Sequence, residues 1–359
     1  MTTMPQTRSD VTTEPTIFVG IDTHKHTHHA AIVDPAGREL ADAEFAATPS
    51  GYQQLLAWTA SHGTVSTFGV EGTGTYGTSL TRVLHTAGHR VIDVDRPDRK
   101  ARRAHGKTDP LDAYAAARAV ASGRATAVAK DRNTDVEALR LLHMAIRQTV
   151  TARATAITEL KASLVITPEP LRSDLANLTD TALFRRCTHL RPDATSDPVL
   201  RAAKTVLRAT THRITALTTQ IAALRRDRRT LIHQLAPTLL EQPGIGEDSA
   251  TQLLITFGAN TDRIKSEAAF AHLTGTAPIP ASSGKTNRHR LNRGGDRQAN
   301  RSLYIIAINR LRCDERTRTY AARRTAEGKT RRDIIRSLKR YIARETYRLI
   351  TTQTTPCAL

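Results

Sequence analysis

Four carboxylates in the first third of the chain stand where acidic residues are locally unexpected. Asp22 and Glu71 each end a short apolar run, and Asp109 and Asp112 lie at the start of an alanine-rich segment. Two-metal phosphoryl transfer needs several carboxylates around ions roughly 3.5–4 Å apart, and Mg²⁺ prefers oxygen ligands. The four acids therefore predict a Mg²⁺ site that acts on a phosphate group.

The positions of these acids also predict the elements that carry them. The apolar runs before Asp22 and Glu71 predict strands, and the ends of paired strands are rigid platforms at one edge of a sheet. Asp109 and Asp112 are three residues apart, which places them on one face of a helix. All four carboxylates can then converge if the two strands are neighbours.

Each acid has a structural explanation as well. Asp109 and Asp112 suit the N-cap and N3 positions of a helix with Pro110 at N1. Asp22 suits the start of a turn, and Glu71 suits a loop. Their joint occurrence upstream of a strongly basic segment favours metal binding over these explanations.

Residues 16–128 predict an α/β domain of the ribonuclease-H-like class. Three strands are expected first, followed by a helix, a strand, a helix, a strand and a helix, which is the order of that fold. Other α/β folds share parts of this order. The expected strands are 16–23, 29–33, 39–46, 65–70 and 90–94, and the expected helices lie near 50–61, 76–87 and 109–121.

Residues 129–236 predict two long helices joined by a partly irregular segment that contains several prolines. The second helix has a heptad pattern, with Arg228 at one of its a positions. The pattern fits either a helical hairpin within one chain or an intermolecular coiled coil that makes a dimer. We favour the coiled coil, because two helices alone bury little surface. The heptad residues are Leu207, Ile214, Leu217, Ile221, Leu224, Leu231 and Leu235, and the looser stripe of the first helix is Leu139, Leu142, Ile146, Val150, Ile157, Leu160 and Leu164.

Residues 237–350 predict a mainly helical C-terminal domain that begins with the turn Gln242–Gly246. This turn resembles a helix-hairpin-helix contact to a nucleic-acid phosphate, and the alternative is a tight turn with a helix N-cap. Between Lys285 and Arg348 there are 20 Lys and Arg against 6 Asp and Glu, which accounts for most of the net charge of +19. Apolar residues recur at helical spacing in this segment, so we expect a folded basic surface.

This charge balance favours a nucleic-acid partner. A second basic surface is expected at Arg96–Lys107. Aromatic residues make up 4% of the chain, so stacking of many bases is not expected. The candidate nucleic-acid contacts are Arg99, Arg102, Arg103, Lys107, Lys285, Arg288, Arg290, Arg293 and Arg297.

Other features exclude several classes of protein. The chain has no run of 18 apolar residues for a membrane span, and residues 1–15 lack the apolar core of a signal peptide. Three widely spaced cysteines form neither a metal-ligand pattern nor a disulfide framework, which favours a cytoplasmic location. Four histidines between His24 and His29 lack a complementary ligand cluster for zinc, and His24 or Lys25 is a candidate phosphate contact. Residues 1–15 are expected to be disordered, and residues 351–359 to form a tail.

A serine in a long non-helical segment is a candidate nucleophile. Ser283 precedes Gly284 and is followed by several cations, which could stabilise a phosphate under attack. The segment also suits a phosphate-binding loop or a plain turn.

Several segments resemble the motifs of one family, the Piv-invertase-like DEDD insertion-sequence transposases. The resemblance covers about residues 16–349, with all motifs in order. The acidic segments are Val19–Asp22, Val70–Gly74 and Lys107–Ala113, and the C-terminal segments are Gln242–Gly246 and Ser283–Asp296.

The resemblance implies a RuvC-like N-terminal domain, a coiled-coil linker and a smaller transposase domain. It implies that Asp22, Glu71, Asp109 and Asp112 bind Mg²⁺, and that Ser283 attacks DNA to form a transient 5′-phosphoserine link. Ser282, one residue away, is the alternative nucleophile. The family also implies a bridge RNA that pairs with donor and target DNA, and tetramers assembled from dimers.

One part of the chain departs from the family pattern. The Gly294-Gly295 pair and the residues Arg288 and Arg290 differ from the usual Ser-Lys-x-Gly run, which leaves the phosphate contacts of that loop open. The leading hypothesis is a transposase that cuts and rejoins DNA strands. The alternatives are a Holliday-junction resolvase or nuclease that activates water, and a non-catalytic nucleic-acid-binding protein.

Overall fold

The structure is a computed structural model that describes residues 15–94, 108–259, 263–281 and 289–353. Contacts divide the chain into two compact units, Met1–Thr134 and Asp135–Leu359. The division into three domains stays a prediction. The expectations for residues 1–14 and 354–359, and for the basic surface Arg96–Lys107, concern segments outside the described residues.

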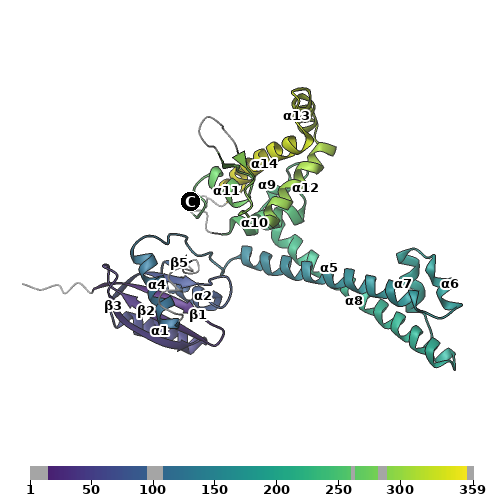
Figure 1. Cartoon of the computed structure of the whole chain (residues 1–359), viewed down its shortest axis with the longest axis horizontal. Helices are drawn as coiled ribbons and strands as arrows, with labels where there is room; N and C mark the ends of the chain where they lie inside the picture. The colour runs from purple at the N-terminus through teal and green to yellow at the C-terminus, as the bar shows by residue number, and fades with distance from the viewer. Residues whose placement is uncertain (1–14, 95–107, 260–262, 282–288, 354–359) are drawn as a thin grey trace, which may run out of the picture. The chain divides into compact units, whose positions relative to one another are not determined.

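A mixed five-stranded sheet forms the centre of the N-terminal unit (Figure 1), in the order β3-β2-β1-β4-β5. Strand β2 is antiparallel to both β1 and β3, whereas β4 is parallel to β1 and β5 is parallel to β4. This arrangement fits a ribonuclease-H-like domain, and the predicted order of strands and helices is confirmed. The strands are β1 (Thr16–Thr23), β2 (Thr27–Val33), β3 (Glu39–Ala46), β4 (Thr64–Glu71) and β5 (Val91–Val94).

Helices cover both faces of this sheet. Helices α1 (Pro49–Ala60) and α2 (Thr78–Thr86) contribute Leu55 and Leu80 to the main core on one face. Helix α4 (Asp109–Ala121) covers the other face and packs against β1, β2 and β4. Because α4 packs on this face, Asp109 and Asp112 in its first turn also lie on this side of the sheet.

Two glycines let α4 approach the sheet closely. A Cβ atom added at Gly20 would lie 2.1 Å from both the Ala113 carbonyl oxygen and the Ala117 nitrogen. A Cβ added at Gly69 would lie 2.8 Å from Cγ1 of Val120. Because backbone atoms cannot move aside easily, a larger residue at Gly20 would displace the helix.

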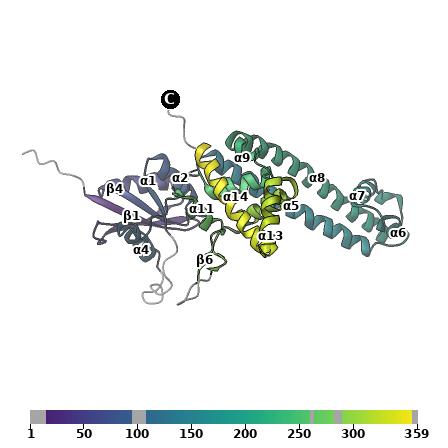
Figure 2. The ribbon, with the colours of Figure 1, turned by 90° about the horizontal axis from the view of Figure 1, so that it is seen from above.

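The second unit begins with two long helices that lie side by side (Figure 2), α5 (Asp135–Val165) and α8 (Pro198–Leu235). The structure thus forms the helical hairpin within one chain, while pairing with a second copy stays a prediction. The heptad residues Leu207, Ile214 and Ile221 are buried along the seam. The connecting segment contains α6 (Leu171–Ala176), a 3₁₀ turn (Pro192–Ala194) and α7 (Asp180–Thr188), which packs on α8.

One residue of the predicted α5 stripe is misplaced. Val150 is 38% exposed, whereas Thr149 is buried. The α-helix has 3.6 residues per turn, so a fixed seven-residue pattern drifts around a straight helix.

The C-terminal helices share one core with the inner ends of α5 and α8, which contribute Leu139 and Ile232. Phe257 and Phe270 are fully buried there, and the interleaved apolar residues predicted in the basic segment, such as Ile306, are buried as well. The elements are α9 (Pro237–Leu240), α10 (Glu247–Phe257), α11 (Glu267–Leu273), β6 (Ile279–Pro280), β7 (His289–Arg290), α12 (Arg297–Cys313), α13 (Glu315–Ala326) and α14 (Arg331–Gln353). No helix within the described residues combines the length and apolar character needed to cross a membrane.

The contact between Gly20 and α4 gives a stability prediction. Gly20→Ala is expected to lower the free energy of unfolding by about 3 kcal/mol, because the added methyl group meets backbone atoms. Gly74→Ala is the control, since its Cβ would meet only the end of the flexible Arg132 side chain, at 3.2 Å. Urea unfolding measures both variants, and equal midpoints would show that the close approach does not constrain the fold.

Candidate metal centre and nucleic-acid interface

Asp22 is the penultimate residue of β1, and Glu71 is the last residue of the neighbouring parallel strand β4. Ile21 pairs in register with Val70, one residue before each acid, and the Thr23 hydroxyl donates a hydrogen bond to the Glu71 carbonyl oxygen at 2.7 Å. Each acid lies two residues after a glycine that faces α4, and side chains alternate along a strand. The alternation therefore places both acids on the face covered by α4.

The start of α4 supplies the other two acids. Thr108 is the N-cap, and Asp109 is the first residue of the helix. The N-cap explanation for Asp109 is therefore wrong, because Thr108 takes that position. Asp112 lies about one turn further on and is 6% exposed.

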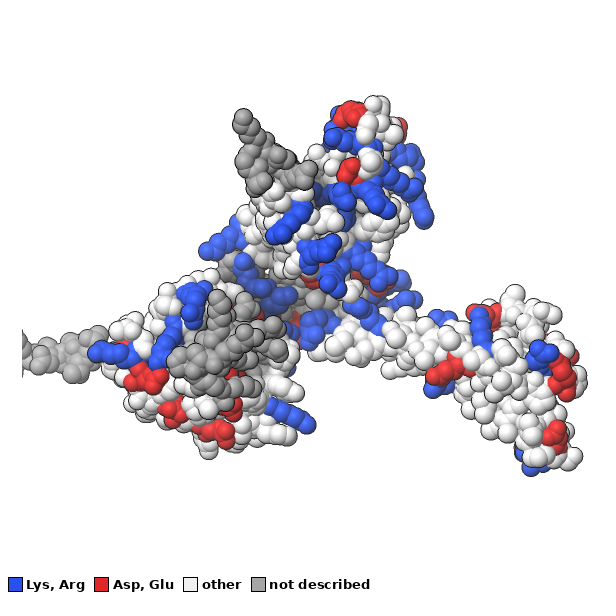
Figure 3. Space-filling model, viewed as in Figure 1, with Lys and Arg blue, Asp and Glu red and all other residues white. Residues whose placement is uncertain are grey.

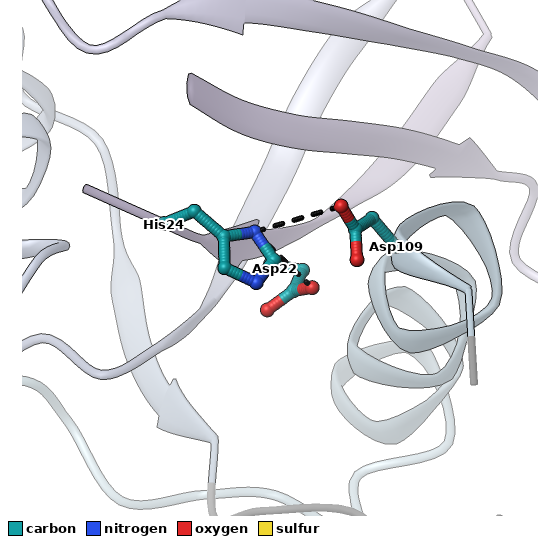
Figure 4. A group of neighbouring side chains, drawn as sticks. All are labelled: Asp22, His24 and Asp109. Carbon is teal, nitrogen blue, oxygen red and sulfur yellow. Dashed lines mark ion pairs between the residues drawn. The ribbon is translucent and has the colours of Figure 1, made fainter. Parts of the chain in front are cut away.

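Asp22, His24 and Asp109 form a group that could hold a metal ion (Figure 4), with ligand atoms within 4.8 Å of one another. Nδ1 of His24 lies 3.9 Å from Oδ2 of Asp22 and 3.7 Å from Oδ2 of Asp109. The Asp22 side chain is 9% exposed, whereas those of His24 and Asp109 are 40% and 44% exposed. The group therefore has one buried carboxylate and opens to solvent on its other side.

The donor set fits a divalent cation. Carboxylate oxygens suit Mg²⁺ or Mn²⁺, and imidazole is a ligand that transition metals accept. A cation between Asp22 and Asp109 would also offset the repulsion between two like charges. From the sequence, His24 was predicted only as a candidate phosphate contact. Its position two residues after Asp22 was the signal that it could be a metal ligand.

A hydrogen-bonded network holds α4 to the sheet beside Asp112. Tyr114 donates to Oδ1 of Asp42 at 3.0 Å, and Nε2 of His29 lies 2.7 Å from Oδ2 of the same carboxylate. Burial, followed by the hydrogen bond to Asp42, raises the pKa of Tyr114 to about 12. The sequence did not indicate this network, because its three residues lie on different elements.

The turn after Glu71 is also fixed. Gly72 has a φ angle of +71°, in the region that favours glycine. The Thr73 hydroxyl donates to Oδ1 of Asp93 at 2.7 Å, which ties the turn to β5. Glu71 therefore precedes a tight and anchored turn, in contrast to the predicted alternative of an acid in an ordinary loop.

The predicted nucleophile lies outside the described residues. Ser283, its neighbour Ser282, and the cations Lys285 and Arg288 belong to segment 282–288, and Arg99, Arg102, Arg103 and Lys107 belong to segment 95–107. The described ends of the serine segment pair as antiparallel strands, with Ile279 opposite Arg290. Three exposed arginines follow the serine segment: Arg290 on β7, Arg293 in the loop after it and Arg297 at the start of α12.

Gly295 and Asp296 hold the start of α12 against the turn at Gly275 and against α10. A Cβ at Gly295 would lie 2.4 Å from the Gly275 nitrogen, so these two turns need glycine to touch. Oδ1 of Asp296 caps α12 by accepting from the Gln298 nitrogen at 2.8 Å, and its Oδ2 accepts from the Thr256 hydroxyl at 2.7 Å. The departure from the usual family run at this point thus has a packing role.

The turn that resembles a helix-hairpin-helix contact has acidic residues at its helix start. Glu247 and Asp248 occupy the first turn of α10, where Arg228 pairs with Asp248 and Arg229 pairs with Glu247. Negative charge already satisfies this positive helix end. The geometry therefore favours a structural turn at Gly246.

Basic side chains concentrate in the C-terminal part of the second unit. On the face drawn in Figure 3, Lys and Arg gather over the C-terminal helices, and the distal part of the α5–α8 pair shows few of them. This distribution agrees with the basic segment predicted from Lys285 to Arg348.

Two family models match the chain. A DEDD transposase model of the IS110 type matches residues 19–167, and a model described as the transposase IS116/IS110/IS902 family matches residues 236–322. The first covers the sheet and its acids, and the second begins at the C-terminal helices.

Two curated proteins are similar to this chain. An insertion element IS110 uncharacterized 43.6 kDa protein from Streptomyces coelicolor is 34% identical over 41% of this chain, and the match spans 35% of that relative. An insertion element IS900 uncharacterized 42 kDa protein from Mycobacterium paratuberculosis is 24% identical over 90% of this chain and 93% of its own length. Residues 19–167 and 236–322 therefore match transposase domains of the IS110/IS116/IS902 family.

Proposed function

We propose that this protein is a transposase that cuts and rejoins DNA strands during movement of an insertion sequence. The observation that carries the proposal is the convergence of Asp22 and Asp109 with His24 at the end of β1. Strand-end acids on an α/β sheet, together with a strongly basic C-terminal part, fit phosphoryl transfer on a polyanion. The two family matches support the same reaction class.

The acids Asp22, Glu71, Asp109 and Asp112 would hold Mg²⁺, with His24 as a fifth candidate ligand. When bound, the metal ion supplies positive charge that stabilises the charge developing on the phosphate oxygens. The sheet holds Asp22 rigidly beneath α4, so its carboxylate needs little reorganisation during the reaction. The exposed sides of His24 and Asp109 leave room for a DNA phosphate to approach.

Ser283 would act as the nucleophile. Its Oγ attacks the phosphorus, the Oγ–P bond forms as the P–O3′ bond breaks, and the departing 3′-oxygen takes up the proton released by the serine. The 3′-hydroxyl of a second strand then attacks the phosphoserine and restores the free serine. The exposed cations Arg290 and Arg293 beside the β6–β7 pair would attract the DNA phosphates to this segment.

The partners and assembly follow from the family resemblance. A bridge RNA would pair with donor and target DNA, so that sequence recognition rests on base pairing and the protein supplies backbone contacts. The protein would act in the cytoplasm as a tetramer assembled from dimers, with the α5–α8 pair as a candidate contact between copies. The net charge of +19 supports binding of both RNA and DNA.

A Holliday-junction resolvase or nuclease is the second candidate. The acidic group lies entirely within the N-terminal unit, and such a group can activate water without a serine from elsewhere. A covalent protein–DNA intermediate separates the two candidates, because only the serine mechanism forms one.

The acidic site predicts a loss of chemistry without a loss of binding. Asp22→Asn is expected to lower the rate of strand exchange by roughly 100-fold or more, because one ligand charge is removed from the metal site. Binding of labelled DNA should stay within about twofold of the wild type, since phosphate contacts come from Lys and Arg. An Asp22→Asn protein with wild-type strand exchange would refute the metal assignment.

Asp180→Asn is the control for Asp22→Asn. Asp180 is exposed on α7 and forms an ion pair with Lys161 at 2.7 Å. This variant should keep strand exchange and Mn²⁺ binding, whereas Asp22→Asn should weaken Mn²⁺ binding in titration calorimetry.

The two serines can be separated by trapping. After denaturation, wild-type protein and Ser282→Ala should retain a covalent link to DNA labelled at its 3′ end, and Ser283→Ala should lose both the link and strand exchange. Loss of the link in Ser282→Ala alone would assign the nucleophile to Ser282. DNA cleavage by the wild type without any covalent link would favour the resolvase.

A further inference from the structure

Helix α14 carries four arginines spaced one turn apart. Arg336, Arg340, Arg344 and Arg348 recur every four residues, which corresponds to about 6 Å along the helix axis. Side chains at this spacing lie along one side of a helix. The four therefore form a ladder of positive charge.

A single carboxylate serves three members of this ladder. Glu267 on α11 lies 2.9 Å from Arg344, 3.8 Å from Arg340 and 4.0 Å from Arg348. Arg348 remains 72% exposed. One negative charge cannot neutralise three guanidinium groups, so the ladder keeps a net positive charge.

The half-buried Lys339 adds to this positive charge. Its ammonium donates to Oδ1 of Asn300 at 2.8 Å. Burial, and then repulsion from Arg336, lowers the pKa of Lys339. The positive charges of Lys339 and Arg336 are therefore close enough to repel each other.

Tyr341 stands between two hollows along the ladder. A hollow of about 440 Å³ is lined by Arg336 and Arg340 and by Leu291, which follows β7. A second hollow, of about 660 Å³, lies among α12, α13 and α14. Tyr341 and Arg344 line both, so the two hollows are neighbours along α14.

An aromatic platform lies along these hollows. The rings of Tyr341 and Tyr320 meet edge to face, with centroids 5.7 Å apart. The Arg323 guanidinium lies 5.6 Å from the centre of the Tyr320 ring. Tyr341 is 51% exposed, so one of its surfaces is available to a ligand.

We propose that this surface, the α14 track, binds a single-stranded nucleic acid. The track comprises Arg336–Arg348 on α14 with Tyr320 and Arg323 on α13. The arginine ladder holds successive phosphates, and Tyr341 stacks on an unpaired base. The inference rests on the proposed function and deepens it, by naming a single strand as the partner of the C-terminal basic surface.

The aromatic platform decides between a single strand and a duplex. Stacking on a tyrosine requires an exposed base face, which a duplex hides within its own stack. RNA and DNA single strands offer the same phosphates and base faces, so both belong to the proposed ligand class.

Tyr341→Leu tests the stacking contact. In fluorescence anisotropy with the full-length protein, this variant should bind a labelled 20-nucleotide RNA or DNA single strand about tenfold more weakly. Binding of duplex DNA of the same sequence should stay within about twofold. Tyr341→Phe keeps the ring and should bind single strands as the wild type does.

Tyr304→Leu is the matched control, because Tyr304 on α12 is 46% exposed and lines neither hollow of the track. Arg348→Ala should lower the slope of log affinity against log salt by about 0.7, as expected for one lost phosphate contact on a single strand. Arg208→Ala, on the exposed face of α8, should leave that slope unchanged.

Selective loss of single-strand binding in Tyr341→Leu supports the track, and separate RNA and DNA measurements show which strand it prefers. Equal binding by Tyr341→Leu and Tyr304→Leu, or an equal loss on duplex DNA, would overturn it. Failure of the track would leave the transposase proposal intact, because that proposal depends on strand exchange by Asp22 and Ser283 variants.

Discussion

The close approach of α4 to the sheet is the constraint on which the acidic site depends. Gly20 and Gly69 leave no side chain between the two layers, and each precedes an acid of the site by two residues on the same strand face. Because side chains alternate along a strand, the face that needs glycine for close packing of α4 is also the face that carries the acids. With a larger residue at Gly20, the helix would lie further out, and Asp109 would lose its position beside Asp22.

A second constraint operates among the helices of the other unit. Arg228 occupies a heptad position in an apolar seam, yet it is 2% exposed and pairs with Asp248 at the start of α10. A buried charge is tolerated only with a partner, so this pair fixes how α8 meets α10. The chain has 53 Lys and Arg but 34 Asp and Glu. Acids such as Asp248 therefore pair with only some of the arginines, and these pairs stabilise contacts between helices. Exposed cations such as Arg290, Arg293 and Arg297 can face a polyanion.

Local patterns in the sequence were enough to predict most of the N-terminal fold. Apolar runs and turn residues defined the five strands, and the four acids stood out against those runs. His24 could not be ranked as a ligand, because its proximity to Asp109 depends on where α4 lies. The link between Tyr114 and Asp42 likewise joins residues that only the folded sheet brings together. The pairing of α5 with α8 could not be predicted either, since a heptad fits a partner in the same chain as well as one in another.

Overall composition does not indicate the local arrangement of the aromatic residues. An aromatic content of 4% predicts little base stacking across the whole protein, but stacking needs only one or two rings placed among phosphate-binding cations. Tyr320 and Tyr341 are 21 positions apart in sequence and meet because α13 packs against α14. For base stacking, the positions of a few aromatic residues therefore matter more than their number. Arginines beside these rings would attract the negatively charged backbone of a nucleic-acid strand.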